Sequence, residues 1–114
     1  NPIEHITSAI PSFPPEKIIS ILFSSGTTSE PKAIPWTQLT PVKSAMDAYY
    51  HMGFNNSTRA NWTTGMGWMM APWLMFATLL NGGTLVLYRG AYHQKDFIDY
   101  CLQSKTNFLG PFSF

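Results

Sequence analysis

Charged residues and cysteine are scarce in this sequence, and no run of basic residues occurs. Lysine, arginine, aspartate and glutamate make up 11% of the 114 residues, whereas about 25% is usual for a soluble domain, so a large part of the chain is expected to be buried. The net charge of +1 comes from scattered residues, which gives no indication of nucleic acid or an anionic membrane as a partner. Cys101 is the single cysteine, and we expect it to be a small core residue.

Metal-ligating side chains are sparse, and the longest apolar stretch is short. His5, His51 and His93 are widely separated and have no cysteine or carboxylate at ligand spacing, so we expect no metal site made by the protein alone. The stretch from Met66 to Leu80 contains Pro72 and falls short of the roughly 20 residues that span a bilayer. We therefore predict a buried helix after a loop, and no transmembrane segment.

The chain divides into a proline-rich start and a longer segment with regular patterns. Residues 1–17 contain several prolines among polar residues, which predicts an irregular approach segment. Residues 18–23 are a β-branched and aromatic run that predicts a largely buried strand. Thr40 and Pro41 supply an N-cap and a first helical residue, and Gly53 supplies a stop, for a helix between them. One face of that helix carries Val42, Ala45, Met46 and Tyr49.

The second half of the chain predicts an α/β fold with a βαβ unit. Residues 84–88 and 106–109 have the composition of strands, and two strands joined through a helix should lie parallel in one sheet. The helix that connects these two strands is predicted to be amphipathic and carries Phe97, Ile98, Cys101 and Leu102.

The chain begins at Asn1 and ends in apolar residues. We therefore expect residues 18–114 to be one part of a larger domain that is truncated at both ends.

A hydroxyl-rich loop follows the first predicted strand. Binding a triphosphate needs several donors close to the backbone, and Gly26 allows the chain to turn with positive φ. Lys32 adds a positive charge on a long stem, and because Glu30 offsets it, a divalent cation would complete the neutralisation. On composition alone, an ordinary surface loop is the alternative. The hydroxyls belong to Ser24, Ser25, Thr27 and Thr28.

The order of residues from Leu22 to Ala33 resembles the phosphate-loop signature of the adenylate-forming, or AMP-binding, superfamily. Ser-Gly-Thr-Thr is followed at the family's distance by Pro-Lys, although Ser29 stands where the family usually has glycine. Residues 33–38 and 66–73 also resemble the plant acyl-activating enzymes related to acetyl-CoA synthetase. The resemblance extends from Ile18 to the last residues and implies a fragment of the large N-terminal domain of such an enzyme.

The resemblance implies an acid-thiol ligase of the acyl-CoA synthetase type. Such enzymes activate a carboxylic acid with ATP to an acyl-adenylate and pass the acyl group to coenzyme A, with Mg²⁺ accompanying ATP. The family's region near the acyl group corresponds to Met66, Trp68 and Met69, with plain core packing as the alternative. Carried over from the family, the residues that bind the ATP phosphates are Ser24, Ser25, Gly26, Thr27, Thr28 and Lys32.

The resemblance leaves a second hypothesis open, namely a truncated, non-catalytic relative or gene fragment that keeps the loop but performs no ligation. The family's magnesium motif, its ribose-binding aspartate and its C-terminal lysine would all follow Phe114, so this chain alone is not expected to catalyse the complete reaction. The plant relatives imply a role in fatty acid metabolism and a peroxisomal or cytoplasmic location. Trp36, Trp62 and Trp73 are expected to be structural.

Overall fold

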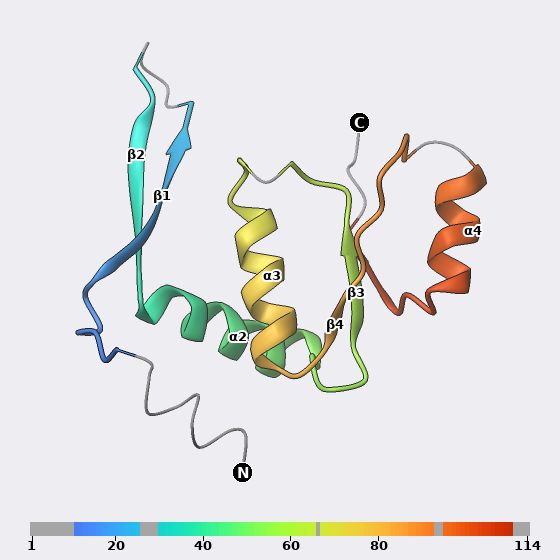
Figure 1. The fold of residues 1–114 in the computed structure, drawn as a ribbon, viewed down its shortest axis with the longest axis horizontal. Helices are drawn as coiled ribbons and strands as arrows, with labels where there is room; N and C mark the ends of the chain where they lie inside the picture. The colour runs from blue at the N-terminus through green and yellow to red at the C-terminus, as the bar shows by residue number, and fades with distance from the viewer. Residues whose placement is uncertain (1–10, 26–29, 66, 93–94, 111–114) are drawn as a thin grey trace.

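The structure, a computed structural model, describes residues 11–25, 30–65, 67–92 and 95–110. These residues form an antiparallel hairpin, a small parallel sheet and helices beside them (Figure 1). Within the proline-rich start, the described residues 11–17 contain no helix or strand. The elements in chain order are β1 (Ile18–Ser24), β2 (Lys32–Thr37), α2 (Leu39–Met52), β3 (Arg59–Trp62), α3 (Met70–Leu80), β4 (Thr84–Leu85), α4 (Lys95–Gln103) and β5 (Phe108–Gly110).

β1 and β2 form an antiparallel hairpin, of which the sequence pattern predicts only the first strand. The prediction that this strand is largely buried is wrong, because no residue of β1 is buried and Ile21 and Phe23 are 52% and 67% exposed on a two-stranded hairpin. The pattern does not predict β2 because Pro35 lies within it, and proline cannot donate a hydrogen bond to a sheet. Proline is tolerated because each strand of a two-stranded hairpin has a free edge. Residues that pair across the hairpin point to the same side. On one side the pairs are Ser20 with Trp36, Leu22 with Ile34, and Ser24 with Lys32.

The second sheet is parallel and confirms the α/β fold class. Its strand order is β4-β3-β5, and β3 pairs in parallel with both neighbours. The strands predicted at 84–88 and 106–109 therefore lie parallel in one sheet, but they are not adjacent, because β3 separates them. Both are also short, since β4 covers only Thr84–Leu85 and β5 only Phe108–Gly110. β3 is not predicted by its sequence, in which arginine and asparagine interrupt the apolar pattern.

The core lies where the helices meet the parallel sheet. α3 packs against both α2 and β3, as Figure 1 shows. The predicted buried helix in the apolar stretch is confirmed as α3, and no helix in the described ranges has the length and apolarity that a membrane crossing requires. In α4, Phe97 and Cys101 are buried as expected, whereas Ile98 and Leu102 are exposed. The central cluster consists of Ala48, Phe54, Ala60, Leu74 and Ala77.

The boundaries of α2 are predicted correctly at one end and wrongly at the other. Gly53 ends the helix with φ of 70°, a conformation that suits glycine. The helix begins at Leu39, with Gln38 as its N-cap, so the prediction that Thr40 is the N-cap is wrong. Thr40 instead accepts a hydrogen bond of 3.0 Å from the backbone N–H of Thr37. The Thr40 hydroxyl, in the first turn of α2, therefore provides a hydrogen-bond partner for the backbone N–H of Thr37 just before the helix.

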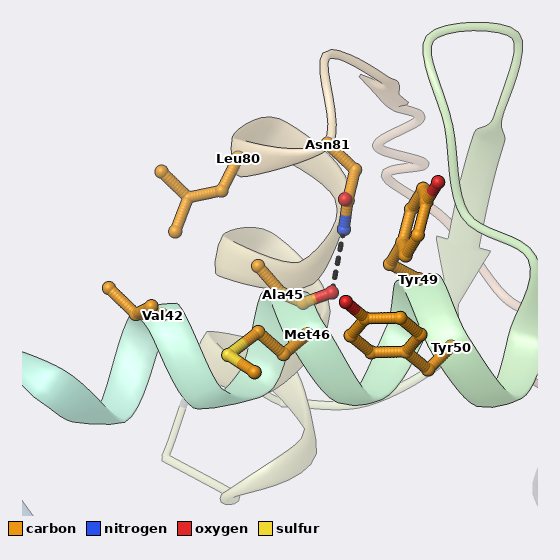
Figure 2. A pocket seen from close by; sticks show the side chains of 7 residues that line it. All are labelled: Val42, Ala45, Met46, Tyr49, Tyr50, Leu80 and Asn81. Carbon is orange, nitrogen blue, oxygen red and sulfur yellow. Dashed lines mark hydrogen bonds between the residues drawn. The ribbon is translucent and has the colours of Figure 1, made fainter.

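The predicted apolar face of α2 is largely exposed rather than packed in the core. The buried residues of α2 are Pro41, Ser44 and Ala48, because α3 covers that side of the helix. Figure 2 shows the predicted face beside the end of α3, where the two helices border a shallow pocket of about 350 Å³. Its lining consists of Val42, Ala45, Met46, Tyr49, Tyr50, Leu80 and Asn81.

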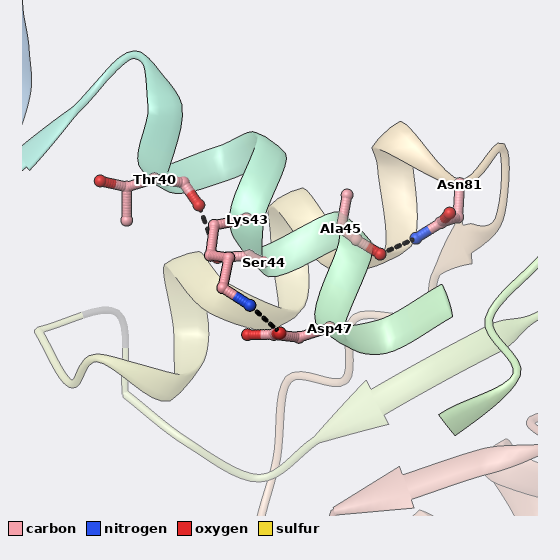
Figure 3. A network of polar contacts seen from close by, with 6 residues as sticks. All are labelled: Thr40, Lys43, Ser44, Ala45, Asp47 and Asn81. Atoms are coloured by element: carbon pink, nitrogen blue, oxygen red, sulfur yellow. Dashed lines mark hydrogen bonds and ion pairs between the residues drawn. The ribbon is translucent and has the colours of Figure 1, made fainter. Parts of the chain in front are cut away.

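Polar contacts join α2 to the end of α3 (Figure 3). The side-chain amide of Asn81 donates to the backbone carbonyl of Ala45 at 2.9 Å and to that of Ala77 at 2.7 Å. Within α2, the Ser44 hydroxyl donates to the carbonyl of Thr40 at 3.0 Å. Asn81 therefore bridges the two helices.

Candidate functional site

The hairpin brings the two flanks of the phosphate-loop sequence together. Ser24 ends β1, Lys32 begins β2, and the two residues are direct partners in the strand register. Their side chains therefore point to the same side of the hairpin. Ser25 follows β1 and is exposed, as is Lys32, so both are accessible to a ligand. Of the other predicted phosphate-binding residues, Gly26, Thr27 and Thr28 lie outside the described residues.

A cavity of about 560 Å³ lies between this hairpin and the segment that leads into α3. Ser24 and Ser25 line it from the hairpin, and Trp68 and Met69 line it from the α3 side. Two predicted sets of site residues that are distant in the sequence therefore border one space. Its volume lies within the range of about 300–1,000 Å³ that is typical of small-molecule sites. Met66, the third acyl-pocket candidate, lies outside the described residues.

The chemistry of the cavity wall is apolar with a few hydroxyls. Among the described residues, no charged side chain lines the cavity, and its polar side chains are the two serines. An apolar wall beside hydroxyl groups suits a ligand with an apolar part and an anionic part. The apolar side chains belong to Leu22, Phe23, Pro31, Ile34, Trp68 and Met69.

The exposure of the two described acyl-pocket candidates bears on the alternative that they are ordinary core residues. Trp68 is 69% exposed and Met69 is 54% exposed. Side chains this exposed do not contribute to a packed core in this part of the chain. Both alternatives nevertheless stay open, and the acyl-pocket assignment stays a prediction.

The remaining tryptophans have packing roles. Trp36 is buried, and its ring centroid lies 6.3 Å from that of Phe76 in α3. Trp62 and Trp73 pack against the central cluster and lie 6.4 Å apart in an edge-to-face arrangement. This agrees with the expectation that all three are structural.

Sequence reasoning misses the contribution of β2 to the cavity. Pro31 and Ile34 line the wall next to Leu22 and Phe23 of β1, and none of these four is predicted as a site residue. The alternation of Ile34 and Trp36 with smaller residues is a strand signal, but the prolines on either side of Ile34 hide it.

Comparison with known proteins identifies the family. The model of the family described as "AMP-binding enzyme" matches residues 3–110. The chain therefore belongs to the AMP-binding enzyme family. It is 46% identical over 97 residues to hexanoyl-CoA synthase of Cannabis sativa, covering 85% of this chain and 14% of that protein. It is also 46% identical over 91 residues to probable acyl-activating enzyme 17, peroxisomal, of Arabidopsis thaliana, covering 80% of this chain and 13% of that protein.

A solved structure supports the same assignment. Acetoacetyl-CoA synthetase from Streptomyces lividans superimposes with a TM-score of 0.77 and 29% sequence identity, covering 95% of this chain and 18% of that one. The resemblance to adenylate-forming enzymes, and among them to plant acyl-activating enzymes, is confirmed. The chain spans only 13–14% of the length of the plant relatives quoted above.

Proposed function

We propose that this chain supplies the ATP-phosphate loop and part of the acyl pocket of an acid-thiol ligase, as one part of a larger AMP-binding domain. In the first half-reaction, a carboxylate oxygen would attack the α-phosphorus of ATP, and pyrophosphate would leave. In the second, the thiol sulfur of coenzyme A would attack the acyl carbon, and AMP would leave. The observation that supports this proposal is the single cavity bordered by Ser24 and Ser25 on one side and by Trp68 and Met69 on the other.

The residues of the hairpin fit the phosphates of ATP. Ser24 and Ser25 offer hydroxyl donors, and Lys32 offers an ammonium group on the same side of the hairpin as Ser24. Charge-assisted contacts from such groups stabilise anionic oxygens more strongly than neutral contacts do. Gly26, Thr27 and Thr28 complete the proposed set through the family resemblance. Their role would be to hold the β- and γ-phosphates while the substrate reacts at the α-phosphorus.

Mg²⁺ and coenzyme A complete the proposed set of cofactors. The described residues hold no group of three or more His, Cys, Asp or Glu side chains that could bind a metal ion. Mg²⁺ would therefore arrive with the nucleotide phosphates, and we assign it no protein ligand among these residues. Coenzyme A is proposed because the Cannabis sativa relative is named a CoA synthase. When bound, coenzyme A would supply the thiol that accepts the acyl group.

The proposed substrate is a carboxylic acid with an apolar chain. Trp68 and Met69 offer polarisable and aromatic surface that adapts to different apolar shapes.

Two relatives from Arabidopsis thaliana are named peroxisomal, so we propose a peroxisomal location, with the cytoplasm as the alternative. Fluorescence microscopy of the tagged full-length protein beside a peroxisomal marker would decide between the two locations.

The test is ATP–pyrophosphate exchange by the intact parent protein across a panel of carboxylic acids. We expect acid-dependent exchange that falls at least about tenfold in Lys32→Ala, since a hydrogen bond to a charged group contributes about 1.5–3 kcal/mol. Lys95→Ala serves as the matched control, because it removes another exposed lysine, in α4 and away from the cavity lining. That control should exchange at the wild-type rate.

Each outcome has a defined meaning. If the wild-type protein binds no ATP and shows no exchange with any acid, the ligase proposal is wrong, and the non-catalytic relative is the better description. If exchange occurs but Lys32→Ala matches Lys95→Ala, the ligase proposal stands, and Lys32 loses its assigned role.

A further inference from the structure

We propose that Trp36 is a positioning residue, which holds the phosphate-binding end of the hairpin at a fixed place relative to α3. The inference rests on the proposed function and adds a residue that the family resemblance does not assign to the site. Among the described residues, Trp36 does not line the cavity, and its partner in the strand register is Ser20 rather than Ser24. It would act through the hairpin that carries Ser24 and Lys32.

Trp36 is the only buried side chain of the hairpin among the described residues of β1 and β2. It is 5% exposed, and its ring lies against Phe76 on α3. The rest of the hairpin is half-buried or exposed. One aromatic side chain therefore provides the main packed contact between the hairpin and the helix beside it.

The geometry of β2 connects this contact to the site. Lys32, Ile34 and Trp36 alternate along the strand, so their side chains point to the same side of the hairpin. At a rise of about 3.3 Å per residue, Trp36 lies roughly 13 Å along the strand from Lys32. Ile34, between them, lines the cavity. The side of β2 that packs on α3 at Trp36 is therefore the side that borders the cavity at Ile34.

α3 carries the opposite wall of the same cavity. Phe76 lies within α3, and Met69 is the N-cap residue of that helix. Because a helix is a stiff element, fixing the hairpin to Phe76 also fixes it relative to Met69 and the adjoining Trp68. The Trp36–Phe76 contact thus sets the separation between the phosphate side and the acyl side of the cavity.

The hairpin is also attached to the rest of the chain at its base. The backbone N–H of Gln38 donates to the carbonyl of Lys17 at 3.0 Å, and the chain continues directly into α2. These links hold the base at one end, whereas a two-stranded hairpin is marginally stable without side-chain packing. Without the Trp36 ring, the hairpin could tilt about its base. A displacement of about 1 Å at a reacting centre can lower a rate about 100-fold.

The test compares the two half-reactions in the intact parent protein. Phosphate positioning matters for adenylation, which is measured by ATP–pyrophosphate exchange. It does not matter for thioester formation from supplied acyl-adenylate and coenzyme A, because pyrophosphate has already left. We expect Trp36→Ala to lower kcat/KM for ATP in the exchange assay about 10- to 100-fold, while the rate of thioester formation stays within about twofold of the wild type. Trp36→Phe, which keeps a ring against Phe76, should restore most of the exchange activity.

Trp73→Ala is the control for the loss of another packed tryptophan. Trp73 is partly buried, packs against the central cluster, and pairs with Phe54 and Trp62 rather than with a ring of the hairpin, so any loss of folded protein should reduce both half-reactions by the same factor. If Trp36→Ala also reduces both equally, or reduces neither, the positioning role is refuted.

Two further outcomes are an unfolded Trp36→Ala variant and a wild-type protein without exchange activity. If Trp36→Ala does not fold, Phe76→Leu removes the same ring contact from the α3 side, and it must lower exchange selectively for the inference to hold. A wild-type protein without exchange would overturn the proposed function itself, whereas active wild-type protein with unselective variants overturns only the role of Trp36.

Discussion

Two buried threonines differ in whether the hydroxyl has a hydrogen-bond partner, and this difference predicts opposite effects of the same substitution. Thr78, in α3, is 0% exposed, and its Oγ1 has no hydrogen-bond partner among the described residues. Thr58, just before β3, is 6% exposed, and its Oγ1 accepts a hydrogen bond of 2.9 Å from the backbone N–H of Asn55. We expect Thr78→Val to stabilise the fold and Thr58→Val to destabilise it.

The magnitudes follow from the surroundings of each hydroxyl. Burying an unpaired hydroxyl costs about 1–3 kcal/mol, and valine removes that cost while keeping the branched shape. The space around Thr78 is limited, since the residue is 0% exposed. The larger methyl group should therefore cost about 1 kcal/mol in overpacking, which leaves a net gain of about 1 kcal/mol in the free energy of unfolding. At Thr58, loss of the hydrogen bond should cost about 0.5–1.5 kcal/mol.

Urea unfolding of the intact parent protein, followed by tryptophan fluorescence, measures both effects. The midpoint should rise for Thr78→Val and fall for Thr58→Val, with the slope of the transition unchanged. Thr78→Ser is the control, because it keeps the hydroxyl and removes a buried methyl group, so its midpoint should fall. If Thr78→Val lowers the midpoint as much as Thr58→Val does, then the Thr78 hydroxyl has a partner, such as a buried water molecule. The reasoning about Thr78 would then be refuted.

Two further substitutions test the packing of the sheet and of the helices by the same unfolding measurement. Gly110→Ala should lower the free energy of unfolding by about 1–3 kcal/mol, because its Cβ would overlap the indole ring of Trp62; an unchanged midpoint would contradict the close packing of β5 on β3. Asn81→Asp should cost about 1–3 kcal/mol, because aspartate cannot donate the two hydrogen bonds that Asn81 makes to the carbonyls of Ala45 and Ala77. Asn81→Gln is the control that keeps the amide, and equal losses in both variants would count against these hydrogen bonds.

The sequence predicts those parts of the fold that depend on local patterns. Residues 18–23 form a strand because β-branched and aromatic residues suit an extended chain, and the phosphate-loop signature directly follows it. Gly53 ends α2 because glycine readily adopts the positive φ found there. The apolar stretch before Leu80 forms a helix, and the α/β class follows from strands that alternate with helices. In each case the residues within one element determine the outcome.

The sequence does not predict features that depend on partners distant in the chain. β3 forms between β4 and β5 because its neighbours offer a ladder on both sides, although its own four residues have weak strand character. The face of α2 that carries Val42 and Met46 has helical spacing, yet α3 covers the other side, which is lined by smaller residues. Apolar spacing predicts a helix face, but it does not identify which face meets the neighbouring helix.

The cavity illustrates the same limit for the candidate site. The phosphate-loop motif predicts Ser24 and Ser25 as ligand-binding residues, but their place beside Trp68 and Met69 in one cavity depends on how the hairpin packs against α3. That packing includes the contact between Trp36 and Phe76, neither of which belongs to the phosphate-loop motif. Motif residues can therefore be predicted one segment at a time, whereas the shape of the site depends on contacts between segments.

The two sides of β1 differ in exposure. The half-buried side carries Ser20, Leu22 and Ser24, whereas Ile21, on the opposite side, is 52% exposed. A strand that only supported a core would bury isoleucine. Ser24, on the half-buried side, lines the cavity, which suits a side that meets a ligand. The exposed isoleucine suits a hairpin that is covered by more of the protein, which is the expectation for one part of a larger AMP-binding domain. Solvent protection of Ile21 in the intact parent protein, measured by hydroxyl-radical footprinting, would support that expectation, and a side chain as reactive as an exposed one would contradict it.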